Sequence, residues 1–377
     1  APPTRRGLLV LGMHRSGTSA LGRVLSLLGA DLPAQTIGPD EFNASGYWEA
    51  PELYRLHDQM LARAGSRWDD WRPFHLASLD PYDRAGIEHA FLQFLDREFH
   101  DSKLFFVKDP RICRFVPLWL DVLRNFSTAP GIIIPVRHPF AVAQSLEKRD
   151  GFSLAKSAMI WLRHVVDADH ATRHVPRSFV DYDSLLTDWR EQVDRIAREI
   201  GITWPQPIPA IADEIDRFLS VRLRHHVASV GALDESKDVV SWVRRAYAAV
   251  RALARDGDHE AARRDLDQVR AEFDNACLAL GELEREERSH VAQESLSQLG
   301  VVSKQSLDRS MQQLDRRCTA LDAGLRDTLA RTNAVDMTVS VLQRTAEQQE
   351  RAMIAIQSQA DEVRSRSEAL GHTTTEL

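Results

Sequence analysis

The sequence is poor in cysteine and has no long apolar run. Its three cysteines, Cys113, Cys277 and Cys318, are too few and too widely spaced for a disulfide framework or a paired-ligand zinc site. We therefore expect reduced thiols and a cytoplasmic protein. The first residues, APPTRR, lack the apolar core of a signal peptide, and the apolar run at 8–11 is too short to cross a bilayer. We expect no transmembrane segment.

The sequence also has no excess of positive charge. The 48 lysines and arginines are outnumbered by 55 aspartates and glutamates, which gives a net charge of −7. This balance argues against binding of nucleic acid over the whole surface, so we expect no nucleic-acid partner. No cluster of residues has the spacing of metal ligands, and the sequence predicts no metal site.

Short apolar runs alternate with helical patterns in the first part of the chain. Runs at residues 7–11, 104–107, 132–136 and 178–181 have the length of buried strands, and three of them precede segments with helical periodicity. Strands that alternate with helices are typical of βαβ units and a parallel sheet. We therefore predict an α/β domain over residues 1–232, with a parallel sheet flanked by helices.

Proline is absent after Pro209, and the composition changes near the end of this domain. Glycine becomes sparse and Ala, Glu, Arg, Gln and Leu dominate, which predicts a helical region over 233–300. An amphipathic helix within it is indicated by a set of spaced apolar residues: Leu266, Val269, Phe273, Leu280 and Leu283.

The last part of the chain, residues 301–377, is predicted to be a coiled-coil-like helical tail with a disordered end. Two apolar sets repeat there every seven residues: Met311, Cys318, Leu325, Val339, Ala346 and Met353, and Leu314, Leu321, Val335, Leu342, Ile356 and Val363. Such a seam could pair with a second copy of the chain or with a partner helix. It could also fold back within the chain, and the pattern does not choose between these arrangements.

A short loop, residues 12–19 (GMHRSGTS), directly follows the first apolar run and precedes a helical pattern. Backbone N–H groups of such a loop and of the helix N-terminus point at one place, where the helix dipole favours an anion. The loop nearly matches that of ATP- and GTP-binding proteins, but Thr18 stands at the position of their lysine. Arg15 could supply the missing charge. An ATP-dependent kinase, a non-catalytic coiled-coil scaffold and a turn without a ligand are the alternatives.

A second candidate anion site follows the run at 132–136. Arg137 stands at the carboxyl end of this predicted strand, where open α/β sheets bind their ligands. Ser145 and Arg149 are four residues apart in the helix predicted after Pro139, so they share one helix face. The three side chains could converge on one phosphate. Alternatively, Arg137 could pair with an acid while Ser145 lies on the surface.

Together these segments resemble the sulfotransferases that use 3′-phosphoadenosine 5′-phosphosulfate (PAPS), in particular the bacterial and tyrosylprotein-type branch with an R-S-G-T loop. Residues 15–18 (RSGT), Lys108-Asp109-Pro110 and residues 179–186 (FVDYDSLL) are similar to three of its segments, with Asp183 in place of a glutamate. Arg137 and Ser145 have the spacing of its 3′-phosphate site. The resemblance covers about residues 7–230 and implies a P-loop-like sulfotransferase fold, with PAPS as donor and no metal.

The resemblance also implies roles for single residues. Arg15 would stabilise the transferred sulfonate, Lys108 the leaving group, and Glu49 would act as general base. The residues expected to bind the donor are His14, Arg15, Ser16, Gly17, Thr18, Ser19, Arg137, Ser145, Arg149 and Tyr182. His14 and His57 are alternatives for the base, since histidine needs less adjustment of its pKa. Glu49 could instead be an acidic residue at the start of the helix near Pro51.

Of the substrates that the resemblance implies, the sequence defines the acceptor least. Aromatic residues gather after the first predicted helix: Tyr47, Trp48, Trp68 and Trp71. They could stack on sugar rings, which suggests a carbohydrate or glycoconjugate acceptor, or they could simply pack in the core. Asp109 and Arg111 could bind the acceptor or form a surface pair. The basic cluster Arg224–His226 could close over the donor or lie on a solvated helix face.

Overall fold

The computed structural model describes residues 5–41, 43, 46–219, 241–278, 311–313, 316, 319–320 and 323–324. The chain divides into two compact units, Ala1–Glu286 and Glu287–Leu377. The described positions of the second unit are helical. Most of the predicted heptad seam and the basic cluster Arg224–His226 lie outside the described residues.

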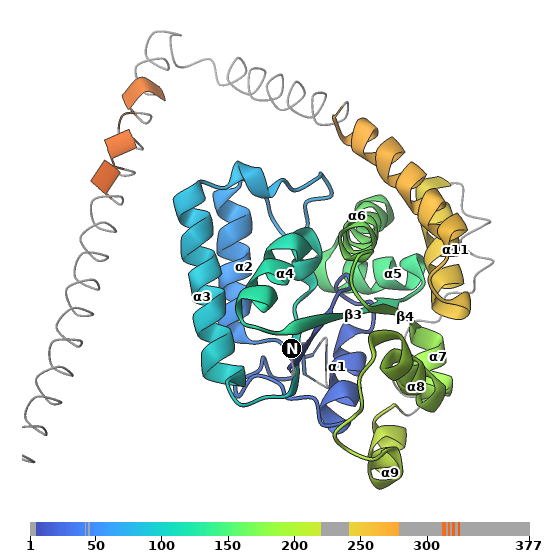
Figure 1. Ribbon diagram of the computed structural model, residues 1–377. Coiled ribbons are helices and arrows are strands. Elements are labelled where there is room, and N and C mark those ends of the chain that lie inside the picture. Colours follow the sequence, from blue (N-terminus) through green and yellow to red (C-terminus); the bar gives the residue numbers. More distant parts are fainter. Residues whose placement is uncertain are drawn as a thin grey trace, which may run out of the picture. The chain divides into compact units, whose positions relative to one another are not determined.

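A parallel sheet of four strands forms the centre of the first unit. The strands are β1 (Arg6–Val10), β2 (Leu104–Lys108), β3 (Ala129–Val136) and β4 (Arg177–Asp181), in the order β2-β1-β3-β4. Each of them coincides with one of the predicted apolar runs, and helices lie on both sides of the sheet (Figure 1). The predicted α/β architecture with a parallel sheet is confirmed.

The register of the strands brings their carboxyl ends to one edge. Val10 lies opposite Lys108 on one side and Ile133 on the other, and Val136 lies opposite Asp181. Side chains that directly follow these residues therefore meet at the same edge. The remaining elements are α1 (Thr18–Leu27), α2 (Pro51–Arg63), η1 (Leu76–Ser78), α3 (Pro81–Phe99), η2 (Pro110–Arg114), α4 (Val116–Asn125), α5 (Pro139–Asp150), α6 (Leu154–Thr172), α7 (Tyr182–Thr187), α8 (Trp189–Ile200), α9 (Ile208–Phe218) and α11 (Ser241–Asp256).

Alternate strand residues point to opposite faces, so the sheet has two cores. Leu9 and Phe179 face a core built with α2 to α6 and α11, whereas Leu8 and Val180 face a core built with α1, α8 and α9. Each of these leucines is fully buried. Burying one leucine side chain contributes roughly 1.5–3 kcal/mol, and a near-continuous run of buried Leu, Val, Ile and Phe side chains on both faces holds the strands in place.

Helix α11 and a following helix over 260–278 belong to the same core. Val250 and Leu253 of α11 and Leu266, Val269 and Phe273 of the next helix are buried in it, and α11 packs on β4 and α6. The amphipathic pattern of the second helix therefore covers the sheet domain, and the compact unit runs on past residue 232 to Glu286.

Backbone from another part of the chain lies beside the outer strand β2. The N–H group of Asp31 donates to the Leu104 carbonyl at 2.9 Å, and the Asp31 carbonyl accepts from Phe106 at 3.0 Å. At the opposite edge of the sheet, α8 and α11 both pack on β4.

Candidate active site

The loop between β1 and α1 has a backbone that few residues could adopt. Arg15 and Gly17 have φ angles of 69° and 88°, in the left-handed region. At Gly17 a Cβ atom would lie 2.2 Å from the ring of Tyr182, so only glycine fits there. No side chain in the described structure caps the first turn of α1. The N–H groups of this turn are therefore left for a bound anion, as the loop pattern predicts.

Arg15 joins the two predicted anion sites. Its Nε donates to the hydroxyl of Ser145 on α5 at 2.7 Å, and its carbonyl oxygen accepts from Nη1 of Arg137 at 2.6 Å. The guanidinium of Arg137 also lies over the ring of Tyr182, 4.8 Å from its centre. The structure thus brings together residues of three strand ends that lie far apart in the sequence.

The electrostatics of this cluster favour a negative ligand. Burial lowers the pKa of Arg15, and the neighbouring charge of Arg149 lowers this pKa further. Burial likewise lowers the pKa of Arg137. Arginine nevertheless stays protonated, because its pKa is far above neutral. Positive charges crowded with little water are stabilised when an anion lies among them.

The loop also fits a phosphate or sulfonate group through unused polar atoms. The hydroxyl oxygen of Ser16 and Nε2 of His14 are buried and make no hydrogen bond within the described residues. Burial and the charges of Arg111 and Arg149 hold the pKa of His14 well below its usual range, so its ring is neutral. Since buried polar groups are nearly always paired, these atoms are consistent with a ligand in the loop.

Lys108 and Glu49 form a buried pair beside the start of α1. Nζ of Lys108, at the end of β2, donates to Glu49 Oε1 at 2.6 Å, to the Tyr47 carbonyl at 2.7 Å and to the hydroxyl of Ser19 at 3.2 Å. Burial raises the pKa of Glu49, and the charge of Lys108 only partly offsets that. Trp48, next to Glu49, has a φ angle of 60°, a strained conformation of the kind that clusters at functional sites.

A sulfotransferase family model matches residues 7–206, which is more than half of the chain. The chain belongs to the sulfotransferase family. Two of the similar solved structures are sulfotransferase domains. One is from the curacin biosynthetic pathway, with 13% identity over 54% of this chain and 76% of that chain and a TM-score of 0.34. The other is from the Synechococcus PCC 7002 olefin synthase, with 17% identity over 71% of this chain and 94% of that chain and a TM-score of 0.36. No curated protein matched the sequence.

In this sulfotransferase His57 is part of the core. Its ring is fully buried, with Nδ1 3.0 Å from Asp109 Oδ2 and Nε2 3.0 Å from Nε1 of Trp119. Because the indole N–H can only donate, Nε2 of His57 accepts and Nδ1 carries the proton. Neither ring nitrogen is left for an acceptor, so the expectation of His57 as a possible base is wrong.

Asp109 and Arg111 of the sulfotransferase are likewise inside the protein. Asp109 is completely buried and Arg111 is 2% exposed, which excludes the surface pair that the sequence left open. Arg111 donates to Asp109 at 3.1 Å and to Asp58 at 2.6 Å. Burial by itself raises the pKa of Asp109, but the charge of Arg111 and the hydrogen bond from His57 bring it well below its usual range. The sequence did not predict this network, because no local pattern indicates that Asp109 contacts His57 or that Arg111 contacts Asp58.

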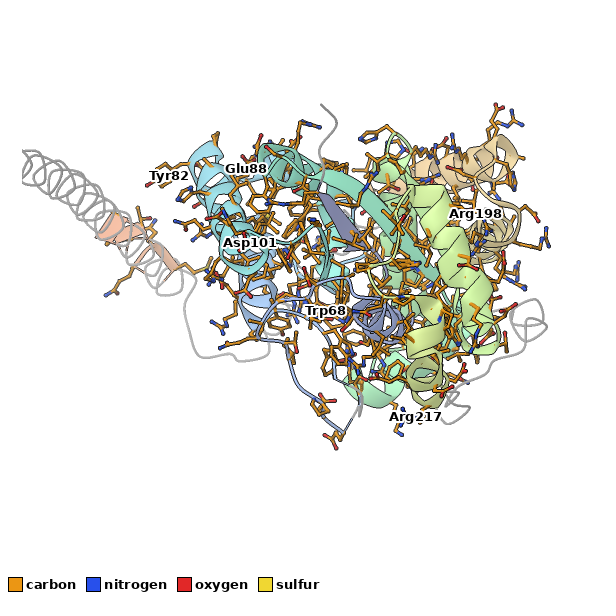
Figure 2. All side chains as sticks on the ribbon, turned by 60° about the horizontal axis from the view of Figure 1, so that its bottom comes forward. Trp68, Tyr82, Glu88, Asp101, Arg198 and Arg217 are labelled. Carbon is orange, nitrogen blue, oxygen red and sulfur yellow. The ribbon has the colours of Figure 1, made fainter. Side chains whose placement is uncertain are left out.

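The aromatic residues of the sulfotransferase divide between the site and the core. Trp68, labelled in Figure 2, has its ring 4.5 Å from that of His14, and Arg149 lies over it at 5.5 Å. Trp71 instead stacks on Phe273 of the helix over 260–278. Of these two, only Trp68 lies beside the loop at 12–19.

Two features are absent from the described part of the sulfotransferase. Within it, no group of three or more His, Cys, Asp and Glu side chains could hold a metal ion. None of its helices is both long and apolar enough to cross a bilayer. The described cysteines, Cys113 and Cys277, are buried free thiols.

Proposed function

We propose that this sulfotransferase moves the sulfuryl group of PAPS to an acceptor hydroxyl by in-line transfer. The observation that carries the proposal is the contact of Arg15 with both Ser145 and Arg137, because it joins two anion sites at neighbouring strand ends. A nucleotide with phosphate groups at both ends of its ribose requires such a pair of sites. The R-S-G-T sequence at residues 15–18 favours the bacterial and tyrosylprotein-type branch of the family.

The loop at 12–19 with the first turn of α1 would hold the 5′-phosphosulfate, and Arg137, Ser145 and Arg149 would hold the 3′-phosphate. When bound, the donor supplies the sulfuryl group and a phosphate leaving group. Arg15 places its guanidinium where negative charge develops, and Lys108 is positioned for the same task by its three hydrogen bonds. Fixed charges of this kind need no reorganisation during the reaction.

Glu49 is proposed as the base that accepts the proton of the acceptor. Burial raises its pKa, which brings a carboxylate closer to the basicity that proton transfer near neutral pH requires. His14 is the second candidate, since its ring is neutral and its Nε2 has no partner within the described residues. The aromatic face of Trp68 beside His14 supports a carbohydrate or glycoconjugate acceptor. A cytoplasmic location and association through the C-terminal tail stay predictions from the sequence.

Binding of 3′-phosphoadenosine 5′-phosphate (PAP) against AMP tests the donor site. Hydrogen bonds to a charged group contribute roughly 1.5–3 kcal/mol each, so two of them predict at least about a hundredfold tighter binding of PAP. Isothermal titration calorimetry measures both ligands. Arg137→Ala should weaken PAP binding by about tenfold or more and leave AMP nearly unchanged, whereas Arg264→Ala on the exposed surface should change neither. Equal affinities for PAP and AMP would rule out the 3′-phosphate site.

The pH dependence of Glu49→Gln tests the base. A base acts when deprotonated, so kcat of the wild type should rise with pH through the raised pKa of Glu49. Glu49→Gln should lower kcat by about 10²–10⁴-fold and remove this rise, with PAP affinity kept within about threefold. His14→Asn is the matched comparison. If His14→Asn removes the pH dependence and Glu49→Gln does not, the base is His14.

A further inference from the structure

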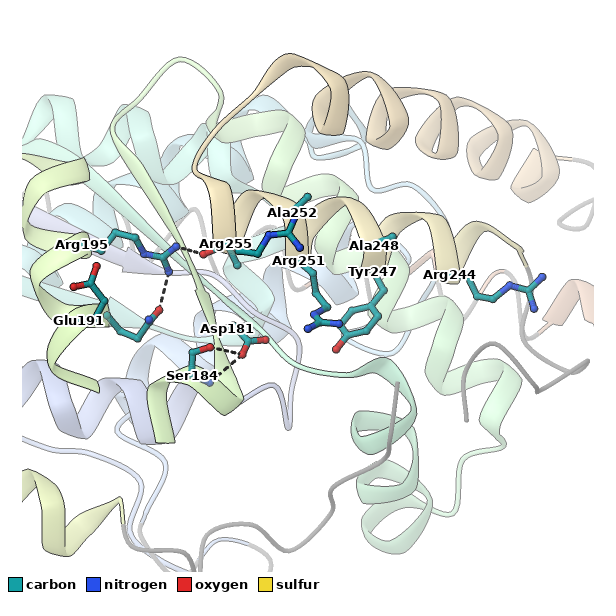
Figure 3. Close-up of a pocket in the computed structure, with 12 residues that line it drawn as sticks. Asp181, Ser184, Glu191, Arg195, Arg244, Tyr247, Ala248, Arg251, Ala252 and Arg255 are labelled. Atoms are coloured by element: carbon teal, nitrogen blue, oxygen red, sulfur yellow. Dashed lines mark hydrogen bonds between the residues drawn. The ribbon is translucent and has the colours of Figure 1, made fainter. Parts of the chain in front are cut away.

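A groove of about 550 Å³ runs along the outer edge of β4, between α8 and α11. Figure 3 shows its lining, with residues of α8 on one side, Asp181 and Ser184 in the middle and α11 on the other. A cavity of this size can hold a small organic molecule rather than a single ion. None of its lining residues is among those proposed to bind the donor, although Asp181 and Ser184 lie on either side of Tyr182 in the chain.

The side of the groove formed by α11 is a row of polar residues. Arg244, Tyr247, Arg251 and Arg255 follow one another at spacings of three or four residues, which places them along one face of the helix. Figure 3 shows them along that helix, beside the groove. Arg251 and Arg255 are exposed, so their guanidinium groups can turn toward a ligand. Small residues of the same helix, Ala248 and Ala252, leave the space between them open.

Arg195 of α8 is a fixed positive charge on the opposite side. Its Nη2 donates to the Phe179 carbonyl at 2.6 Å and to Gln192 Oε1 at 2.7 Å, and its Nη1 donates to the Ala254 carbonyl. All three acceptors are neutral, and Nε is buried without a partner. The guanidinium is therefore held in place while its charge is not balanced by any described carboxylate within ion-pair distance.

The acids of the groove do not neutralise the arginines. Asp181 accepts from the N–H and hydroxyl of Ser184 at 2.9 and 2.8 Å, and Glu191 pairs with Arg198 outside the lining at 3.2 Å. Within the described residues, Arg244 and Arg251 form no ion pair, and Arg255 pairs with the adjacent Asp256. Four arginines thus line the groove with two acids; Glu191 is paired with Arg198 and Asp181 keeps its negative charge, so the lining is positive overall.

We propose that this groove is a second anion site, which binds the charged group of a small organic phosphate or sulfate ester. Guanidinium groups match the oxygens of a phosphate or sulfate through paired hydrogen bonds. Arg195 supplies the rigid donor, Arg244 and Arg251 supply adjustable ones, and Tyr247 and the alanines accommodate the uncharged part of the ligand. The proposal does not depend on the identity of the sulfuryl donor.

Calorimetry of the full chain at low salt tests the groove with three probes: glucose 6-phosphate, glucose 6-sulfate and glucose. At least one ester should bind and glucose should not, and comparison of the two esters identifies the preferred anion. The double variant Arg244→Gln/Arg251→Gln should bind the ester at least tenfold more weakly, because two charge-assisted contacts are lost. Arg264→Gln, an exposed arginine outside the groove, is the control and should bind like the wild type.

Arg15→Ala distinguishes the groove from the phosphate-binding loop. Ester binding should be unchanged in this variant, while circular dichroism verifies that all variants keep their helices. The proposal is overturned if neither ester binds the wild type, or if Arg15→Ala abolishes ester binding and Arg244→Gln/Arg251→Gln does not. PAP binding is measured separately, so failure here leaves the donor site untouched.

Discussion

Replacing Arg15 by alanine is expected to lower kcat for sulfuryl transfer by about a hundred- to a thousandfold, the usual effect of removing one fixed donor from developing charge. Ser145 and Arg137 both contact the loop at 12–19 through Arg15. The backbone should tolerate the change, because both arginine and alanine carry a Cβ atom, so the φ of 69° at this position strains both residues alike. Release of PAP at saturating donor and acceptor measures the rate.

Two further variants make this result specific. Arg15→Lys keeps a charge but loses the planar donor group, so an intermediate rate is expected. Ser145→Ala removes the partner of Nε and should reduce PAP affinity more than kcat. A rate for Arg15→Ala within about threefold of wild type, with normal thermal unfolding, would remove Arg15 from the proposed mechanism.

Asp109→Ala should have the largest effect on stability, a loss of about 3–5 kcal/mol in the free energy of unfolding. The substitution removes the acceptor of the buried Nδ1–H of His57 and one of the two carboxylates around the buried guanidinium of Arg111, which keeps only Asp58. Urea denaturation followed by circular dichroism measures the change. Asp83→Ala removes a partly exposed pair with Arg63 and is the matched control, expected to cost less than about 1 kcal/mol.

The same carboxylate predicts the behaviour of the protein in acid. The pKa of Asp109 is lower in the folded than in the unfolded protein, so its contribution is complete above the ordinary aspartate pKa of about 3.9. It is lost as the pH falls from there toward the lower folded pKa. A loss of under 1 kcal/mol in Asp109→Ala at neutral pH would show that Arg111 and His57 find other partners.

The sequence predicted those parts of the fold and the site that depend on local pattern and on strand ends. Apolar runs located all four strands, and the order of loop and strand-end residues placed Arg15 near Arg137 and Ser145, although Ser145 is 130 residues away. This works because parallel strands bring their carboxyl ends to one edge, whatever the length of the connections.

Properties that depend on packing could not be predicted in this way. His57 resembled a possible base because its neighbours in the chain say nothing of Phe91, Phe115 and Trp119, which surround it. The change of composition near residue 232 marks a more helical stretch, but it does not indicate that α11 completes the core. A helical pattern defines an apolar face and leaves open which surface that face covers.

Other parts of the same unit pack against both edge strands of the sheet, β2 and β4. The backbone at Asp31 pairs with the outer side of β2. At β4, the Arg195 guanidinium donates to the Phe179 carbonyl and α11 packs on the strand. Unpaired strand edges are templates for pairing with other chains and for aggregation. The described sheet therefore offers little edge backbone that a neighbouring molecule could extend into a continuous intermolecular sheet.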